Sequence, residues 1–222
     1  MLVKFCGATT AAEVRGVADA GADLVGLWHQ VPAGRAELSA QRLAGLAAAA
    51  RATGRLQPVL VTFGSDVEAL ARLTAGGGPW WIQLHGYQPP ATVRALRALV
   101  PDGVRIVKVL HVQGASCVEA GLIGAYERAG TDCFLLDAVT ADGRIGSTAL
   151  PLKQATVTAL ADRMARPFLL AGGLSADNAG RFRGAVAHPR FLGIDVDSAA
   201  RGPGGLLAEA HAAAVATAWR TP

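Results

Sequence analysis

Two side chains that could exchange protons with a substrate come directly after short apolar runs of the sequence. Cys6 lies in VKFCGAT (residues 3–9), and Asp137 follows three apolar residues in FLLDA (residues 134–138). A lone cysteine is more often a small buried residue, whereas a carboxylate after an apolar strand is costly unless it is paired or solvated. On opposite sides of a bound molecule, a thiol and a carboxylate can serve as base and acid.

A cysteine acts as a base only as its thiolate, so Cys6 needs a neighbour that lowers its pKa. Lys4 lies two residues before Cys6, and alternate side chains of a strand share one face. We therefore expect Lys4 to lie beside Cys6 and to lower the pKa of the thiol.

A third candidate feature is LLAGGLSADN at residues 169–178, where a strand would end in two glycines and a helix would begin. Glycines let an anion approach backbone N–H groups, and the start of a helix attracts negative charge. The alternative is a tight turn without a ligand. The spacing allows both, although in barrels of alternating strands and helices this corner often holds a phosphate.

The composition restricts the class of protein. The 222 residues are 51% hydrophobic and carry 21 basic against 17 acidic side chains, a net charge of +4 spread along the chain. Because there is no basic tail and no apolar run of membrane-spanning length, we expect neither nucleic acid nor a membrane as a partner. Three cysteines without metal-ligand spacing, and no apolar signal-like start, favour a reduced, cytoplasmic protein.

Runs of strand length alternate with Ala- and Leu-rich segments of helical period. The predicted strands are Leu2–Phe5, Leu24–Leu27, Pro58–Thr62, Trp81–Gln83, Ile106–Val109, Cys133–Leu136, Phe168–Leu170 and Phe191–Ile194. The clearest predicted helices are Ala11–Ala20, Ser39–Ala52, Val67–Leu73, Pro90–Leu99, Leu152–Met164 and Leu206–Ala218. Eight units of about 28 residues fit a (β/α)8 barrel better than a doubly wound sheet of five or six strands. We predict an α/β fold, one (β/α)8 TIM barrel, as a single domain over residues 1–222.

In this fold the catalytic groups lie at the carboxyl ends of the strands. The side chains expected there are Cys6, Trp28, His29, Thr62, Phe63, Gln83, His85, His111, Asp137, Asp195 and Asp197, together with Gly172 and Gly173. A metal site of His29, His85 and Asp195 has no local ligand spacing to support it, so we expect no metal. Of Trp80 and Trp81 only one can face inward; we interpret both as packing residues, with the alternative that Trp81 walls the pocket.

Five stretches resemble motifs of the phosphoribosylanthranilate isomerase family, and they occur in the family's order. They are VKFCGAT, IQLHG at 82–86, FLLDA, LLAGGLSADN and GIDVDSA at 193–199. The resemblance covers nearly the whole chain, and five motifs in register are specific for the family.

The resemblance implies an Amadori rearrangement of the tryptophan pathway, in which an aminoaldose phosphate becomes an aminoketose without a cofactor. It implies that Asp137 is the general acid that protonates the furanose oxygen and that Cys6, as thiolate, removes the C2′ proton. The further substrate contacts that we expect are Asp195 near the amine, Arg35 near the anthranilate carboxylate, Gly172, Gly173, Ser198 and Ala199 around the phosphate, and His85 at the barrel mouth. The expected partner is a phosphorylated sugar amine, and the expected assembly is a monomer or homodimer.

The chain departs from the family pattern in two loops. The loop LWHQVPAGRAELS (27–39) lacks the family's phenylalanine and Ser-x-Arg, and VTADGRIGSTALP (139–151) keeps Gly143 and Gly146 but lacks Gly-Lys-x-Phe-Asp-Trp. These departures leave two alternatives open. One is a diverged member that acts by proton abstraction on another sugar or amine in a specialised pathway, and the other is a non-catalytic barrel partner.

Asp197 is a third departure, because the family has serine or asparagine there. At about 5 Å from a phosphate it would cost about 3 kcal/mol at an effective dielectric constant of 20. A helix N-terminus returns at most about 2 kcal/mol. Asp197 therefore points away, is offset by Arg201, or indicates a ligand without phosphate.

Overall fold

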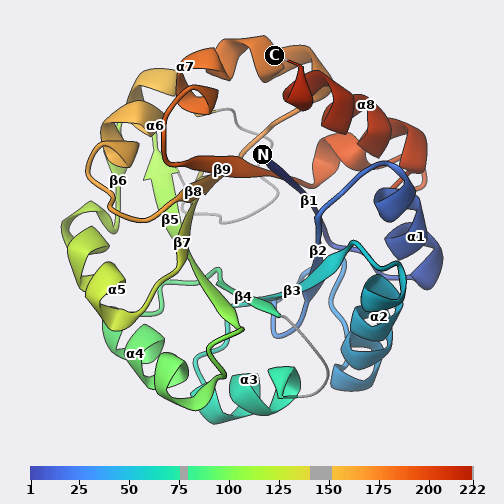
Figure 1. The fold of residues 1–222 in the computed structure, drawn as a ribbon, viewed down its shortest axis with the longest axis horizontal. Coiled ribbons are helices and arrows are strands. Elements are labelled where there is room, and N and C mark those ends of the chain that lie inside the picture. The colour runs from blue at the N-terminus through green and yellow to red at the C-terminus, as the bar shows by residue number, and fades with distance from the viewer. Residues whose placement is uncertain (76–79, 141–151, 222) are drawn as a thin grey trace.

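The computed structural model describes residues 1–75, 80–140 and 152–221. Eight parallel strands close into a barrel that helices surround (Figure 1). Around the ring the order is β1-β2-β3-β4-β5-β7-β8-β9, and the pairs β4–β5 and β9–β1 close it. The barrel strands are β1 Leu2–Cys6, β2 Leu24–Trp28, β3 Gln57–Thr62, β4 Trp81–Leu84, β5 Arg105–Gln113, β7 Cys133–Ala138, β8 Phe168–Leu170 and β9 Phe191–Val196. The predicted (β/α)8 barrel is confirmed.

The outer layer consists of α-helices and short 3-10 helices. The α-helices are α1 Ala11–Asp19, α2 Ala40–Ala52, α3 Val67–Thr74, α4 Pro90–Leu99, α5 Ile123–Ala129, α6 Gln154–Ala161, α7 Arg183–Val186 and α8 Glu209–Arg220. The 3-10 helices are η1 Ala120–Leu122, η2 Ala176–Phe182 and η3 Ser198–Ala200. Helices α2 and α3 begin as their sequences predict, because the side chains of Ser39 and Asp66 accept from backbone N–H groups three residues on.

The main departure from the predicted elements lies in β5. The strand continues four residues past the predicted end at Val109, to Gln113, and then turns back as the short antiparallel strand β6, Ser116–Cys117. His111 therefore lies within a strand and not after one. The short helices α5 and α7 were not among the predicted ones, whereas the predicted helix Leu152–Met164 is shorter, as α6.

Inward-facing side chains fill the barrel interior in two apolar clusters. One consists of Cys6, Leu24, Trp28, Ala36, Val59 and Val61, and the other of Val107, Val109, Cys133, Leu135, Leu169 and Ala171. Trp81, the first residue of β4, packs against both clusters, and its Nε1 donates to the Gln57 side chain at 2.8 Å. Because strands begin at the amino end of the barrel, Trp81 fills that end.

A larger apolar core lies between the strands and the surrounding helices, and alternate strand residues supply it. Phe5, Leu27, Ile82 and Phe134 are fully buried in this layer. Strands covered on both faces are continuous apolar runs, which is why the sequence pattern located them. In the described part of the chain, none of the helices has the length and apolar character needed to cross a membrane.

Trp219 connects α8 to the loop after β8. Its side chain is fully buried and stacks on Phe182 with ring centroids 5.7 Å apart, and its Nε1 donates to the Ser175 carbonyl at 2.9 Å. We expect Trp219→Ala to lower the free energy of unfolding by about 3–5 kcal/mol, because it leaves a cavity. Trp219→Phe keeps a ring and should cost less. Urea unfolding measures both.

The matched control is Leu206→Ala, at a side chain that is 52% exposed, which should change the free energy of unfolding by less than about 0.5 kcal/mol. An unfolding midpoint of Trp219→Ala equal to that of the unmodified protein would contradict this account of the packing.

Candidate active site

A cavity of about 890 Å³ opens at the carboxyl end of the barrel. Its walls come from the ends of β1, β2, β3, β7 and β9, from the residue after β4, and from the loops after β2, β8 and β9. All nine residues predicted for the site line it, namely Cys6, Arg35, His85, Asp137, Gly172, Gly173, Asp195, Ser198 and Ala199. The thiol and the carboxylate thus lie at the same mouth.

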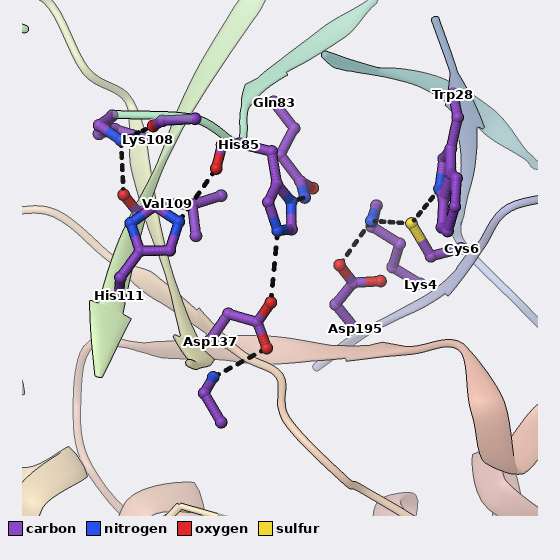
Figure 2. A network of polar contacts seen from close by, with 12 residues as sticks. Lys4, Cys6, Trp28, Gln83, His85, Lys108, Val109, His111, Asp137 and Asp195 are labelled. Carbon is purple, nitrogen blue, oxygen red and sulfur yellow. Dashed lines mark hydrogen bonds and ion pairs between the residues drawn. The ribbon is translucent and has the colours of Figure 1, made fainter. Parts of the chain in front are cut away.

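Cys6 shares the inner face of β1 with Lys4, as the strand period predicts. The Lys4 Nζ lies 3.2 Å from the Cys6 Sγ and 2.6 Å from the Asp195 Oδ2 of the neighbouring strand β9 (Figure 2). From β2, the Trp28 Nε1 donates to the same sulfur at 3.1 Å. Lys4 is fully buried, and a buried ammonium is costly unless an opposite charge pairs with it. Asp195 supplies that charge.

The room for the sulfur depends on the absence of a side chain in β2. Gly26 lies in register with Cys6, and a Cβ atom at position 26 would stand 2.6 Å from the Cys6 Sγ. Any other residue at position 26 would therefore displace the thiol.

The thiol is neutral in this environment at neutral pH. Burial raises the pKa of Cys6 to about 12, and the negative charge of Asp195 adds to this effect while Lys4 opposes it. Burial lowers the pKa of Lys4, but the charges of Asp195 and Cys6 and the hydrogen bonds to both together outweigh it, so the pKa of Lys4 is raised. The expected lowering of the Cys6 pKa is therefore wrong: Lys4 acts in that direction, but burial and Asp195 outweigh it.

Asp137, near the end of β7, faces His85. The Asp137 Oδ1 accepts from the backbone N–H of Ala138 at 2.9 Å, and its Oδ2 lies 3.4 Å from the His85 Nε2 (Figure 2). The Gln83 amide nitrogen lies 2.8 Å from the other ring nitrogen of His85, Nδ1. When Gln83 donates to Nδ1, the proton of the neutral ring must be on Nε2, directed at Asp137.

Three buried polar atoms on the inner side of the barrel have no hydrogen-bond partner among the described residues. They are the Gln83 Oε1, the Asp195 Oδ1 and the His85 Nε2, whose contact with the Asp137 Oδ2 at 3.4 Å is an ion-pair distance and not a hydrogen bond. Buried polar atoms are normally paired, so unpaired donors and acceptors beside a cavity indicate a polar ligand. The set contains both donors and acceptors, as a hydroxylated amine requires.

The loops after β8 and β9 form a second part of the cavity wall from backbone. Gly172 and Gly173 have φ angles of 85° and 60°, which favour glycine, and no described group accepts from their N–H groups. The helix expected here is the 3-10 helix η2, and Ser175 and Asn178 form a capping box at its start. Free N–H groups at such a turn can bind an anion.

Asp197 is held between two arginines. Its Oδ2 lies 2.5 Å from the Arg35 Nη2 and its Oδ1 lies 2.6 Å from the Arg201 Nε. Arg201 also donates to the carbonyls of Cys6 and Gly7. Of the three alternatives for Asp197, the structure contains the one in which Arg201 offsets its charge, with Arg35 as a further partner. The three side chains together carry one net positive charge.

The loop after β2 brings Arg35 to the cavity through strained backbone. Gln30 and Ala33 have φ angles of 58° and 54°, a region that costs a residue with a Cβ atom roughly 1–2 kcal/mol. The loop at 139–151 lacks the family's Gly-Lys-x-Phe-Asp-Trp run, and its residues from 141 onward lie outside the described residues.

Four residues that were expected near the strand ends, but not among the nine predicted site residues, also contribute to the site. Trp28 and Phe63 line the cavity, Phe63 stacks on His85 at 5.2 Å, and Lys4 and Gln83 support Cys6 and His85 from below. Strand period predicted Lys4 beside Cys6, and the same two-residue spacing relates Gln83 to His85. Trp81 does not wall the pocket.

The remaining candidates do not reach the cavity. His29 lies with its Nδ1 2.7 Å from the Leu38 carbonyl, and His111 is fully buried behind His85. In the part of the chain that the structure describes, no three His, Cys, Asp or Glu side chains gather closely enough to hold a metal ion.

Comparison with known proteins agrees with this geometry. The family model described as N-(5'phosphoribosyl)anthranilate (PRA) isomerase matches residues 3–204. The N-(5'-phosphoribosyl)anthranilate isomerase of Chelativorans sp. (strain BNC1) is 34% identical over 207 residues, which are 91% of this chain and 88% of that protein.

Solved structures agree as well. The crystal structure of TrpF from Jonesia denitrificans superposes with a TM-score of 0.72 and 26% identity, over 99% of this chain and 97% of that one. A phosphoribosyl anthranilate isomerase was solved in complex with reduced 1-(o-carboxyphenylamino)-1-deoxyribulose 5-phosphate. It superposes with a TM-score of 0.72 over 100% of both chains, and its 18% identity makes this a likeness of fold. With its family match over residues 3–204 and a relative at 34% identity, the chain belongs to the N-(5'-phosphoribosyl)anthranilate isomerase family.

Proposed function

We propose that the protein isomerises N-(5'-phosphoribosyl)anthranilate to the corresponding aminodeoxyribulose phosphate, with Asp137 as acid and Cys6 as base. The observation that carries the proposal is that a thiol and a carboxylate line one cavity together with a backbone corner suited to an anion. Family membership supports the same substrate. A phosphorylated aminoketose of this kind, in reduced form, is the ligand in the solved relative.

The first step assigned to Asp137 is protonation of the furanose ring oxygen. The ring C–O bond breaks, and the lone pair of the anthranilate nitrogen forms the C=N bond of a Schiff base. Asp137 must therefore carry a proton when the substrate is bound. His85, whose Nε2 faces the Asp137 Oδ2 at 3.4 Å, orients the carboxyl group for this transfer.

The second step is removal of the C2′ proton by the Cys6 thiolate, which gives an enolamine that tautomerises to the ketone. The thiolate forms only when the field of Asp195 at the sulfur weakens, since burial and Asp195 both raise the pKa of Cys6. The unpaired Asp195 Oδ1 provides the means. An N–H of the bound substrate that donates there weakens the field of Asp195 at the sulfur, so that the thiol releases its proton to solvent at the barrel mouth and Lys4 and Trp28 stabilise the thiolate.

The other contacts follow from the positions of the wall residues. Gly172, Gly173, Ser198 and Ala199 hold the phosphate, since they line the cavity from the two adjacent loops after β8 and β9. Arg35 contacts the anthranilate carboxylate by exchanging its partner, because Asp197 occupies its guanidinium in the structure. No organic cofactor or metal takes part in either proton transfer. We also propose a cytoplasmic, single-domain enzyme over residues 1–222 that acts as a monomer or homodimer.

The acid and the base are tested by substitution. We expect Cys6→Ala and Asp137→Asn each to lower kcat by roughly 10²–10⁴-fold while the protein stays folded, because each removes one positioned proton-transfer group. Product fluorescence or absorbance follows the reaction of freshly generated substrate, and circular dichroism follows folding.

Asp19→Asn, at an exposed position in α1, is the matched control and should leave kcat unchanged. Growth of a tryptophan-requiring strain that lacks the isomerase gives a second readout. Full rescue by the Cys6→Ala variant would reject the role of the thiol, and failure of the unmodified protein to rescue growth would reject the substrate.

The charge state of Cys6 predicts its reactivity. With a pKa of about 12 against 9.0 for an ordinary cysteine, the thiolate fraction at neutral pH is about a thousandfold smaller. Alkylation of Cys6 by iodoacetamide should therefore be slow at pH 7 and rise about tenfold per pH unit up to pH 10. Asp195→Asn should accelerate it, because it removes a negative charge that raises the pKa.

Peptide mass spectrometry resolves Cys6 from Cys117 and Cys133, and Asp19→Asn again serves as the charge-matched control. A fast alkylation of Cys6 that does not depend on pH between 7 and 10 would mean that the thiolate is already present, contrary to this account.

A further inference from the structure

The turn after β4 is buried, and side chains hold its carbonyl groups. His85, Gly86 and Gln88 are all buried, and buried backbone carbonyls need donors. The His85 carbonyl lies 3.0 Å from the His111 Nε2, the Gly86 carbonyl accepts from the Lys108 Nζ at 2.7 Å, and the Gln88 carbonyl accepts from a tyrosine hydroxyl, that of Tyr126, at 2.8 Å.

Two of these donors belong to a buried charge cluster, defined as Lys108, His111 and Glu119. The Glu119 Oε1 lies 2.5 Å from the His111 Nδ1 and 3.9 Å from the Lys108 Nζ, and its Oε2 accepts from the backbone N–H of His111. Lys108 and His111 are fully buried. Both come from β5, His111 from its unpredicted extension, and Glu119 follows β6.

The contacts determine how the His111 ring is protonated. A carbonyl oxygen can only accept, so the Nε2 that faces the His85 carbonyl must carry a proton. The Nδ1 lies within hydrogen-bond distance of the Glu119 carboxylate, 2.5 Å from its Oε1. With both ring nitrogens bonded, the ring has one orientation and the His85 carbonyl is held in one position.

None of the three cluster residues lines the cavity, yet the cluster lies directly behind one that does. The rings of His85 and His111 meet edge to face at 6.1 Å, and the His85 Nε2 faces Asp137 (Figure 2). A buried cluster of charges adds little net stability compared with apolar residues of the same size. What the cluster does provide is a fixed position for the turn that carries His85.

We propose that His111, held by Glu119 and assisted by Lys108, is a positioning residue that fixes His85 against Asp137 and so sets the rate of the acid step. This role rests on the proposed function of Asp137. It acts on turnover more than on substrate binding, because no member of the cluster reaches the cavity itself.

The test distinguishes the effect of the hydrogen-bond donor of His111 from the effect of the size of its ring. His111→Phe keeps a ring of similar size and removes the Nε2 donor, so we expect kcat to fall roughly tenfold to a hundredfold, as small displacements of reacting groups do, with KM unchanged within about twofold. His111→Gln places an amide N–H near the lost Nε2 and should restore most of the turnover. His188→Phe, at the far end of the barrel, is the matched control and should leave kcat unchanged.

A kcat of His111→Phe within twofold of the unmodified protein would overturn the proposal, as would failure of His111→Gln to restore turnover. If His111→Phe does not fold, the unmodified protein still decides. NMR should show a slowly exchanging His111 Nε2 proton coupled across the hydrogen bond to the His85 carbonyl carbon, and an unprotonated Nε2 would overturn the proposal. Full activity of Asp137→Asn would instead reject the proposed function, which separates the two failures.

Discussion

The ammonium group of Lys4 has no access to water, and the site is organised around the need to neutralise it. Its counter-ion is Asp195, which stands in register with Lys4 on β9. Strands β1 and β9 are the first and last of the barrel, so this ion pair forms only when the ring closes. The sulfur of Cys6 lies beside the same ammonium. The environment of the proposed base is therefore a product of barrel closure and not of the local sequence.

The barrel could be predicted because parallel strands covered on both faces are continuous apolar runs, and each of the eight stands out between glycines and helical segments. The end of β5 could not, since His111 and Gln113 interrupt its apolar run and resemble the start of a loop. Only the structure shows that Glu119 pairs with His111 inside the protein. The helix α5 was missed because it has seven residues and no side chain that caps its start.

The residues of the candidate site could be predicted from the sequence better than their charge states could. Strand period placed Lys4 beside Cys6, and strand ends placed Cys6 and Asp137 at one mouth. The direction of the Cys6 pKa was wrong because burial of the thiol raises it, and because Asp195, 191 positions after Lys4 in the sequence, adds a negative charge beside it. Likewise, two arginines neutralise the charge of Asp197, and only Arg201 is near it in the sequence. Pairing between distant strands and loops is the information that a single sequence does not contain.

The indole of Trp81 fills the amino end of the barrel by packing on both interior clusters. A barrel whose amino end is filled in this way admits a ligand from its carboxyl end alone. A ligand that enters past the loops at the carboxyl end leaves by the same route. Substrate and product therefore use the same opening, so the rate of product release can limit turnover even when the proton transfers are fast.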